Sequence, residues 1–127
     1  MIGEIGGTAG ITLACRASAN NEDYTIPFSG KAGFVYVEDV TEIIFRLIQE
    51  QPKGANVVNI NGITCDVSKI IKILNKINKN NKILFKNNNL PVVGEILGNS
   101  PKKYFKNFVF TCLDIGLVKT VEFYKNL

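Results

Sequence analysis

The sequence contains no histidine and no tryptophan. Histidine is the commonest general base and the commonest metal ligand among protein side chains. Its absence excludes Ser-His and Cys-His nucleophile pairs, and also His-based metal sites, within these residues. An enzyme built from this chain alone would have to rely on carboxylates, lysine, tyrosine or cysteine.

Cysteine is scarce, and its spacing does not favour metal binding. The chain has Cys15, Cys65 and Cys112, an odd number with no Cys-x-x-Cys pair. This pattern is typical of reduced cytoplasmic thiols and not of a disulfide framework or a zinc site. A catalytic thiolate needs a base or a positive neighbour, whereas Cys15 and Cys112 lie in apolar stretches. We expect these two thiols to pack, and we predict no metal site.

Long hydrophobic runs are also missing. No apolar run approaches the roughly 20 residues that span a bilayer. The first residues, Met1 to Glu4, carry no basic segment of the kind that begins a secretory signal. We therefore expect a cytoplasmic protein with no membrane partner.

Charge is distributed unevenly along the chain. Of the 127 residues, 46% are hydrophobic and 20% are charged, which is a globular composition at the size of one domain. Residues 1–66 carry four basic and eight acidic side chains, a net charge of −4. Residues 67–127 carry eleven lysines and three acidic residues, a net charge of +8. The two halves together give the overall net charge of +4. We expect a single domain over residues 1–127 with a basic second half.

Apolar residues that recur every three or four positions predict helices in four places. Three of them cover about residues 8–20, 38–51 and 114–127, and another runs from Val67 to Asn78 with Asp66 as its N-cap. A shorter helix is predicted after Ser100-Pro101. The helix that opens at Glu38 has an apolar stripe that should face a core. Its members are Val40, Ile43, Ile44, Leu47 and Ile48.

Short runs of β-branched and aromatic residues predict strands between these helices. The runs are residues 24–28, 34–37, 56–60, 63–65 and 82–86. Helices and strands alternate without an internal repeat, a linker or a heptad array. We therefore predict a mixed α/β fold in which a small sheet of short strands is covered by two to four helices.

Two local patterns have structural explanations that are simpler than functional ones. Gly7-Thr8-Ala9-Gly10 precedes a helix, but a dinucleotide fingerprint also needs a strand before it, and Met1-Ile2 is too short. Glu38, Asp39 and Glu42 lie in a first helical turn, where the helix dipole favours acidic residues. A hard metal ion would need several more oxygen ligands nearby. We interpret the glycines as a turn and the acids as helix capping.

Lysines form a third pattern. Four of them are spaced 3, 4 and 3 apart on one helical face, namely Lys69, Lys72, Lys76 and Lys79. Three others, Lys102, Lys103 and Lys106, are interleaved with Tyr104, Phe105 and Phe108. Counterion release would favour nucleic acid or an anionic membrane at such a surface. Only two arginines are present, although arginine reads guanine edges and phosphates bidentately, so a solvated helix face is the preferred interpretation.

One stretch is more specific. It begins with the run Gly33-Phe34-Val35-Tyr36-Val37-Glu38-Asp39-Val40. An amphipathic helix follows, then residues 54–60, and then Asp66-Val67 at the start of another helix. This order resembles the C-terminal half of NAD-dependent epimerase/dehydratases, which are extended short-chain dehydrogenase/reductases. Further segments also look like the family's. They are residues 7–12 as the substrate-side helix, residues 24–28 as the strand after it, and residues 113–117 and 120–122 in the terminal helix.

The resemblance implies a division into two parts. Members of this family have a Rossmann domain that binds NAD(P) and a smaller substrate-binding domain, and this chain resembles only the smaller one. The family's Tyr-x-x-x-Lys pair is absent, because Phe28, Val40 and Phe108 stand four residues after the tyrosines at 24, 36 and 104, and only three residues follow Tyr124. In a full-length relative this pair and the glycine fingerprint would lie before the position of Met1. The resemblance thus implies no cofactor bound by these residues alone and no catalytic residue among them.

The resemblance also implies which residues meet a substrate. Nucleotide-sugar members usually carry Arg-Asp before the Phe-Val-Tyr-Val strand, whereas Ala32-Gly33 stand here. This difference favours a smaller sugar or polyol-like substrate over a sugar diphosphate. Asp39 should tie the following helix to the strand. The residues that look placed to line a substrate pocket are Thr8, Thr12, Arg16, Phe28 and Ser29.

Two alternatives stay open beside this hypothesis. One is a basic module that binds nucleic acid or another anionic surface through the lysine-rich helix at residues 67–79. The other is a structural or oligomerisation domain, because the loss of a Rossmann partner should leave an apolar face exposed and able to bind a second copy.

Overall fold

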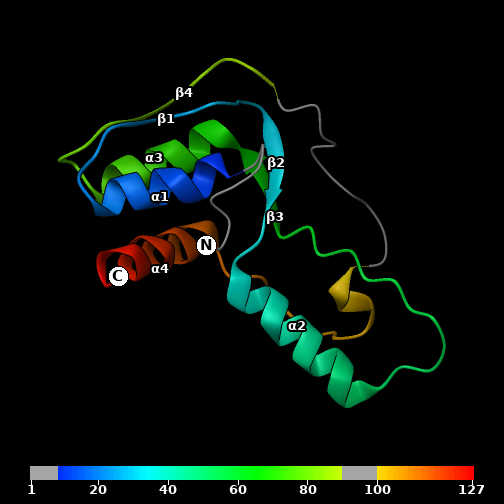
Figure 1. Cartoon of the computed structure of the whole chain (residues 1–127). Helices are drawn as coiled ribbons and strands as arrows, with labels where there is room; N and C mark the ends of the chain where they lie inside the picture. The colour runs from blue at the N-terminus through cyan, green and yellow to red at the C-terminus, as the bar shows by residue number, and fades with distance from the viewer. Residues whose placement is uncertain (1–8, 90–99) are drawn as a thin grey trace.

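The computed structural model describes residues 9–89 and 100–127 of the chain. Helices and strands alternate along these residues (Figure 1). The helices are α1 (Gly10–Ala19), α2 (Val37–Glu50), α3 (Val67–Ile77), the single 3-10 turn η1 (Pro101–Lys103) and α4 (Leu113–Lys125). The strands are β1 (Tyr24–Ile26), β2 (Lys31–Phe34), β3 (Ile63–Asp66) and β4 (Ile83–Phe85). The predicted mixed α/β fold of short strands and several helices is confirmed.

The main core has three layers. Strands β1 and β4 lie on one side of α1 and α3, and α4 lies on the other side (Figure 1). Each layer contributes fully buried aliphatic side chains. They include Ile26 and Ile83 from the strands, Ile70 and Leu74 from α3, and Val121 from α4. Burying branched side chains from all three layers supplies the hydrophobic free energy of this core.

Helix α1 fits into this arrangement because it buries small side chains. Ala14, Ala17 and Ser18 are at most 5% exposed, and α1 packs directly against α4. The distance between two packed helices depends on the side chains at their contact. Small residues on α1 therefore let α4 and β1 approach its backbone closely.

Helix α3 begins and ends close to its predicted bounds. The Asp66 side chain accepts a hydrogen bond of 2.8 Å from the Ser68 backbone N–H, as expected of an N-cap. Hydrogen bonding to Ser68 holds the pKa of the Asp66 carboxyl below its ordinary value. At the other end, the Asn78 amide donates to the Ser18 carbonyl at 2.6 Å and to Asn21 Oδ1 at 2.9 Å. These two bonds tie the end of α3 to the end of α1.

The strands form two separate pairs in the described residues. β1 and β4 run parallel, with Tyr24 opposite Ile83. β2 and β3 run antiparallel, with Lys31 opposite Asp66 and Phe34 opposite Ile63. The strand predicted at residues 34–37 is displaced to Lys31–Phe34, because its pairing with β3 ends at Phe34 and α2 already begins at Val37.

The strand predicted at residues 56–60 is not formed. Instead, the Asn56 side chain donates to three carbonyl oxygens just before it in the chain, those of Pro52, Lys53 and Gly54. A strand needs a neighbour for its backbone hydrogen bonds, and none of the described strands pairs with this segment. The prediction was wrong because side-chain pattern alone does not supply that neighbour.

Helix α2 projects away from the three layers and has a small core of its own (Figure 1). Ile43 is fully buried there with Phe105 and Phe108, which follow η1 in the chain. The predicted apolar stripe of α2 is only partly buried. Ile43 is inside and Leu47 is half-buried, but Ile44 and Ile48 are 50% and 65% exposed. Fewer residues of the apolar stripe of α2 are therefore buried than its sequence pattern predicts.

The close approach of the β2–β3 pair gives the first testable prediction. Gly62 has φ +66°, and a β-carbon there would overlap the Phe34 carbonyl oxygen. Gly54 has a similar φ of +81° but no atom within 4 Å of that position. We expect Gly62→Ala to lower the free energy of unfolding by about 3 kcal/mol or more, and Gly54→Ala by about 1 kcal/mol. Urea unfolding of both variants checks this difference, and equal losses would contradict it.

Candidate functional site

The first turn of α1 packs against the residues that follow β1. A β-carbon at Gly10 would lie 2.9 Å from Phe28 Cε1 and 2.9 Å from Pro27 Cδ. Phe28 is 3% exposed and belongs to the main core. The start of the helix and the end of the strand are thus in direct contact, and glycine is required at their closest point.

Ser29 is held beside the end of β4. Its hydroxyl donates a hydrogen bond of 3.0 Å to Asn89 Oδ1, and its backbone N–H donates to the Asn88 carbonyl at 2.9 Å. An isolated parallel bridge joins Ser29 to Asn89. Nothing in the sequence singled out Asn89, which is the last residue of a run of asparagines and lies 60 positions from its partner. Ser29 is therefore positioned by a contact that only the tertiary structure creates.

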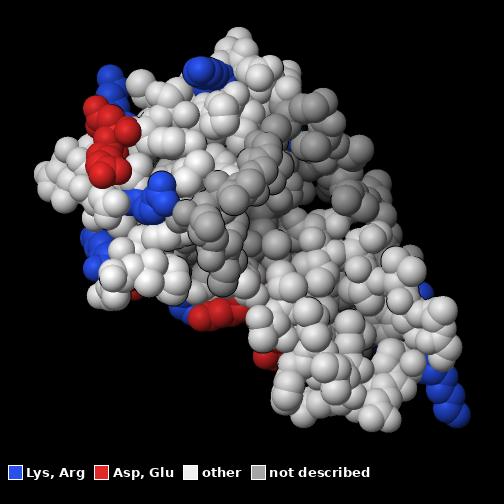
Figure 2. Space-filling view, viewed as in Figure 1, with Lys and Arg blue, Asp and Glu red and all other residues white. Residues whose placement is uncertain are grey.

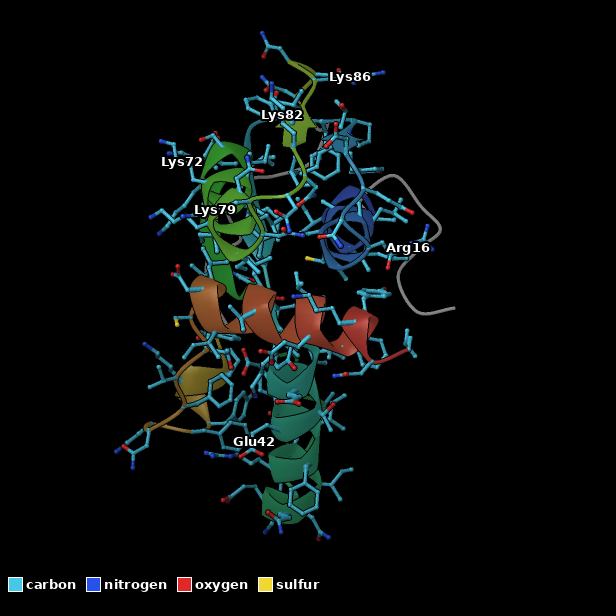
Figure 3. All side chains as sticks on the ribbon, turned by 90° about the vertical axis from the view of Figure 1, so that its left-hand side faces the viewer. Arg16, Glu42, Lys72, Lys79, Lys82 and Lys86 are labelled. Carbon is cyan, nitrogen blue, oxygen red and sulfur yellow. The ribbon has the colours of Figure 1, made fainter. Side chains whose placement is uncertain are left out.

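Thr12 and Arg16 lie one turn apart on α1. Thr12 is half-buried and Arg16 is exposed. Figure 3 shows the Arg16 side chain pointing away from α3. Successive helical residues are rotated by about 100°, so Thr12 faces nearly opposite to Gly10, and Arg16 lies close to the direction of Thr12. This outer face of α1 carries one hydroxyl and one guanidinium as hydrogen-bond donors.

The structure thus brings together only some of the predicted substrate-binding residues. Phe28 and Ser29 are consecutive and packed, and Phe28 contacts the inner face of α1 at Gly10. Thr12 and Arg16 share the outer face of the same helix. Thr8 lies outside the described residues. The assignment of all five to one pocket stays a prediction.

Two acidic residues of α2 form ion pairs, one with α4 and one within the helix. Glu38 accepts a hydrogen bond of 2.8 Å from Lys119 Nζ on α4, and this bond lowers the pKa of Glu38 and raises that of Lys119. Glu42 accepts one of 2.7 Å from Arg46 Nε, four residues later. No side-chain hydrogen bond caps the helix at Tyr36, its N-cap residue. Glu38 lies in the first turn, where it fits the helix dipole, whereas Glu42 lies beyond the first turn, so its prediction as a first-turn acid was wrong. The partners of both carboxylates are other side chains.

Asp39 has a structural role, but not with the predicted partner. Its carboxylate accepts hydrogen bonds from the Thr111 backbone N–H at 2.9 Å and from the Thr111 hydroxyl at 2.6 Å. Asp39 is 8% exposed. The expected tie to the preceding strand is therefore replaced by a tie to the segment that leads into α4. Thr111 lies 72 positions away, and no local pattern marks it as the partner.

The lysines are exposed, but the aromatic residues near η1 are not free to stack on bases. All four lysines of the predicted stripe are exposed on α3 or just after it, and Figure 3 shows Lys72, Lys79, Lys82 and Lys86 around α3 and β4. Phe105 and Phe108 are buried against Ile43, and Arg46 lies 5.8 Å from both ring centroids. Two of the three interleaved aromatics are thus core residues, whereas Tyr104 is half-buried and its hydroxyl donates a hydrogen bond of 3.0 Å to Asn56 Oδ1.

Among residues 9–89 and 100–127, no three acidic or cysteine side chains gather closely enough to hold a metal ion. Within the same residues, no helix combines the length and the apolar character needed to cross a bilayer. Comparison with protein-family models, curated proteins and solved structures finds no match to this chain. Its functional assignment therefore depends on its own residues.

The buried thiol gives a prediction of reactivity. Burial of Cys15 raises the pKa of its thiol to about 12, so it stays protonated at pH 8 and is a poor nucleophile. Cys112 is exposed. We expect an aromatic disulfide reagent to label Cys112 in the folded chain and Cys15 only after unfolding. Labelling followed by mass mapping checks this order, with Cys112→Ser as the control, and rapid labelling of Cys15 in the folded chain would contradict it.

The Asp39–Thr111 contact gives a prediction of stability. Asp39→Ala leaves the Thr111 amide and hydroxyl without their acceptor in a largely buried place, and we expect a loss of about 2–4 kcal/mol in the free energy of unfolding. Glu42→Ala, on the same helix, removes a solvent-exposed ion pair and should cost less than about 1 kcal/mol. Equal effects in urea unfolding would show that Asp39 is not an anchor.

Proposed function

We propose that this chain is the substrate-binding half of an NAD-dependent epimerase/dehydratase that acts on a sugar or polyol-like substrate in the cytoplasm. The observation that supports it most directly is the contact of Gly10 with Phe28. Residues 7–12 and 24–28 resemble the family's substrate-side helix and the strand that follows it. Their contact in the fold is what a shared substrate-binding unit requires.

The proposal assigns binding to this chain and chemistry to another segment. Intact relatives bind NAD(P), which supplies hydride transfer, and use a Tyr-x-x-x-Lys pair that this sequence lacks. The residues here would hold the substrate in a fixed orientation toward those groups, and such positioning accounts for a large part of a rate enhancement.

We assign substrate contacts to the outer face of α1 and to the turn at Ser29. Thr12 and Arg16 offer donors for the hydroxyl oxygens of a sugar. The hydrogen bond from Ser29 to Asn89 fixes the position of the segment that follows β1. Ala32 and Gly33 provide no cation for a diphosphate, so a free sugar should bind as well as its nucleotide-activated form.

Amide NMR titrations test the proposal directly. We expect free hexoses and pentoses at millimolar concentrations to shift the backbone signals of Thr12, Arg16 and Ser29, with weak affinity because only half of the pocket is present. Arg16→Ala should reduce the shifts at least about fivefold by removing a charged donor. Lys72→Glu, a charge change on α3, is the matched control and should leave them unchanged.

Three results would count against the proposal. The first is the absence of shifts at any sugar concentration, and the second is shifts confined to α3. The third is saturable calorimetric binding of NAD or NADP to the chain alone, because the cofactor site is assigned to the other half. A salt-sensitive interaction with RNA that Lys72→Glu abolishes would favour the basic-module alternative.

A further inference from the structure

Helix α2 has one face bound to the protein and one face open to solvent. Asp39, Ile43 and Arg46 bind the segment around η1 and Thr111 on the first face. On the other face, four large apolar side chains are half or more exposed. They are Val37 at 62%, Ile44 at 50%, Phe45 at 56% and Ile48 at 65%. No other described helix exposes as many large apolar side chains.

The spacing on the open face fits another helix. Val37, Thr41, Ile44 and Ile48 are separated by 4, 3 and 4 residues, which is the alternation of a and d positions in a coiled-coil seam. Phe45 lies beside this seam. Figure 2 shows that the visible surface over α2 carries few charged side chains. A second helix with the same spacing could interlock with these residues along the length of α2.

We propose that this face pairs with α2 of a second copy of the chain, antiparallel and related by a two-fold axis. An isologous contact needs a self-complementary surface, and the seam has this property. In the antiparallel arrangement Val37 of one copy packs on Ile48 of the other, and Thr41 packs on Ile44. Every a position then faces a d position, and a small side chain faces a larger one in each layer.

Charge favours the antiparallel direction. Three of the four acidic residues of α2, Glu38, Asp39 and Glu42, lie in its first half. Asp39 is buried against Thr111 on the covered face, so a parallel pair would bring together the exposed Glu38 and Glu42 of each copy and both helix N-termini. The antiparallel pair separates the acidic halves and aligns the two helix dipoles oppositely. Like charges across a helix pair are unfavourable, so the sequence of α2 selects one direction.

The area of the face is sufficient for a weak dimer. An aromatic side chain such as Phe45 has on the order of 150–250 Å² of surface and the aliphatic ones somewhat less, so the four exposed fractions amount to roughly 400 Å² per copy. Two copies would bury roughly 800 Å² of apolar surface, which corresponds to a total interface of about 1,300 Å² at ordinary interface composition. This value lies at the lower end of specific interfaces, and we therefore expect a weak dimer that dissociates on dilution.

Light scattering after gel filtration of the full chain tests the pairing. We expect a mass that rises with concentration toward twice the 14.0 kDa of one chain. Val37→Lys should raise the dimer dissociation constant at least about tenfold. Val109→Lys is the matched control, because Val109 is also an exposed valine, at 79%, but lies outside α2. Circular dichroism should show both variants folded, and an unfolded Val37→Lys would be replaced by Ile48→Gln.

Disulfide trapping in a Cys112→Ser background tests the direction. Val37→Cys chains mixed with Ile48→Cys chains should form crosslinked dimers, because these positions face each other only in the antiparallel pair. Ile48→Cys chains alone should not crosslink, since their two cysteines would lie about 16 Å apart along the axis. Crosslinking of Ile48→Cys alone would overturn the antiparallel arrangement.

A chain that stays monomeric at all concentrations would overturn the proposal. Equal loss of dimer in Val37→Lys and Val109→Lys would also overturn it. The pairing does not depend on the proposed function, because the residues assigned to substrate lie on α1 and after β1. Sugar titrations of the Val37→Lys monomer therefore separate the two proposals.

Discussion

The buried carboxylate of Asp39 connects the two parts of this molecule. Its two hydrogen bonds to Thr111 fix the first turn of α2 to the segment that leads into α4. A charged acceptor with two donors is a strong and directional contact where water has little access. Because α4 belongs to the three-layer core and α2 to the smaller core around Ile43, this contact sets where the second core lies relative to the first.

The same anchor decides which face of α2 is available. Once Asp39 is bound to Thr111, Ile43 and Arg46 turn toward Phe105 and Phe108, and the apolar residues on the other side of the helix turn to solvent. The exposed seam is thus a consequence of a polar contact. On α1, a single contact likewise decides which face is covered. Because Gly10 allows Phe28 to approach the inner face of the helix, Thr12 and Arg16 lie on its outer face. The two proposed binding faces lie on different helices and can act separately.

Part of the fold could be predicted from the sequence because it depends on near neighbours. The helix after Asp66 has an N-cap, an apolar stripe and an end marked by asparagines, and it forms within one residue of its predicted bounds. The candidate site was harder to predict. Thr12 and Arg16 are correctly placed on a helix. The hydrogen bond between Ser29 and Asn89, however, joins residues 60 positions apart, and the one between Asp39 and Thr111 joins residues 72 positions apart. No local pattern contains such pairs.

Local chemistry therefore determined the kind of fold, the starts of the main helices, the absence of histidine chemistry and the basic character of the second half. Only the tertiary structure decided which side of α2 is covered, that residues 56–60 find no partner strand, and that Phe105 and Phe108 pack inside instead of standing beside the lysines. The physical reason is that periodicity identifies an apolar face without identifying what it packs against. Burial depends on the surface supplied by distant parts of the chain.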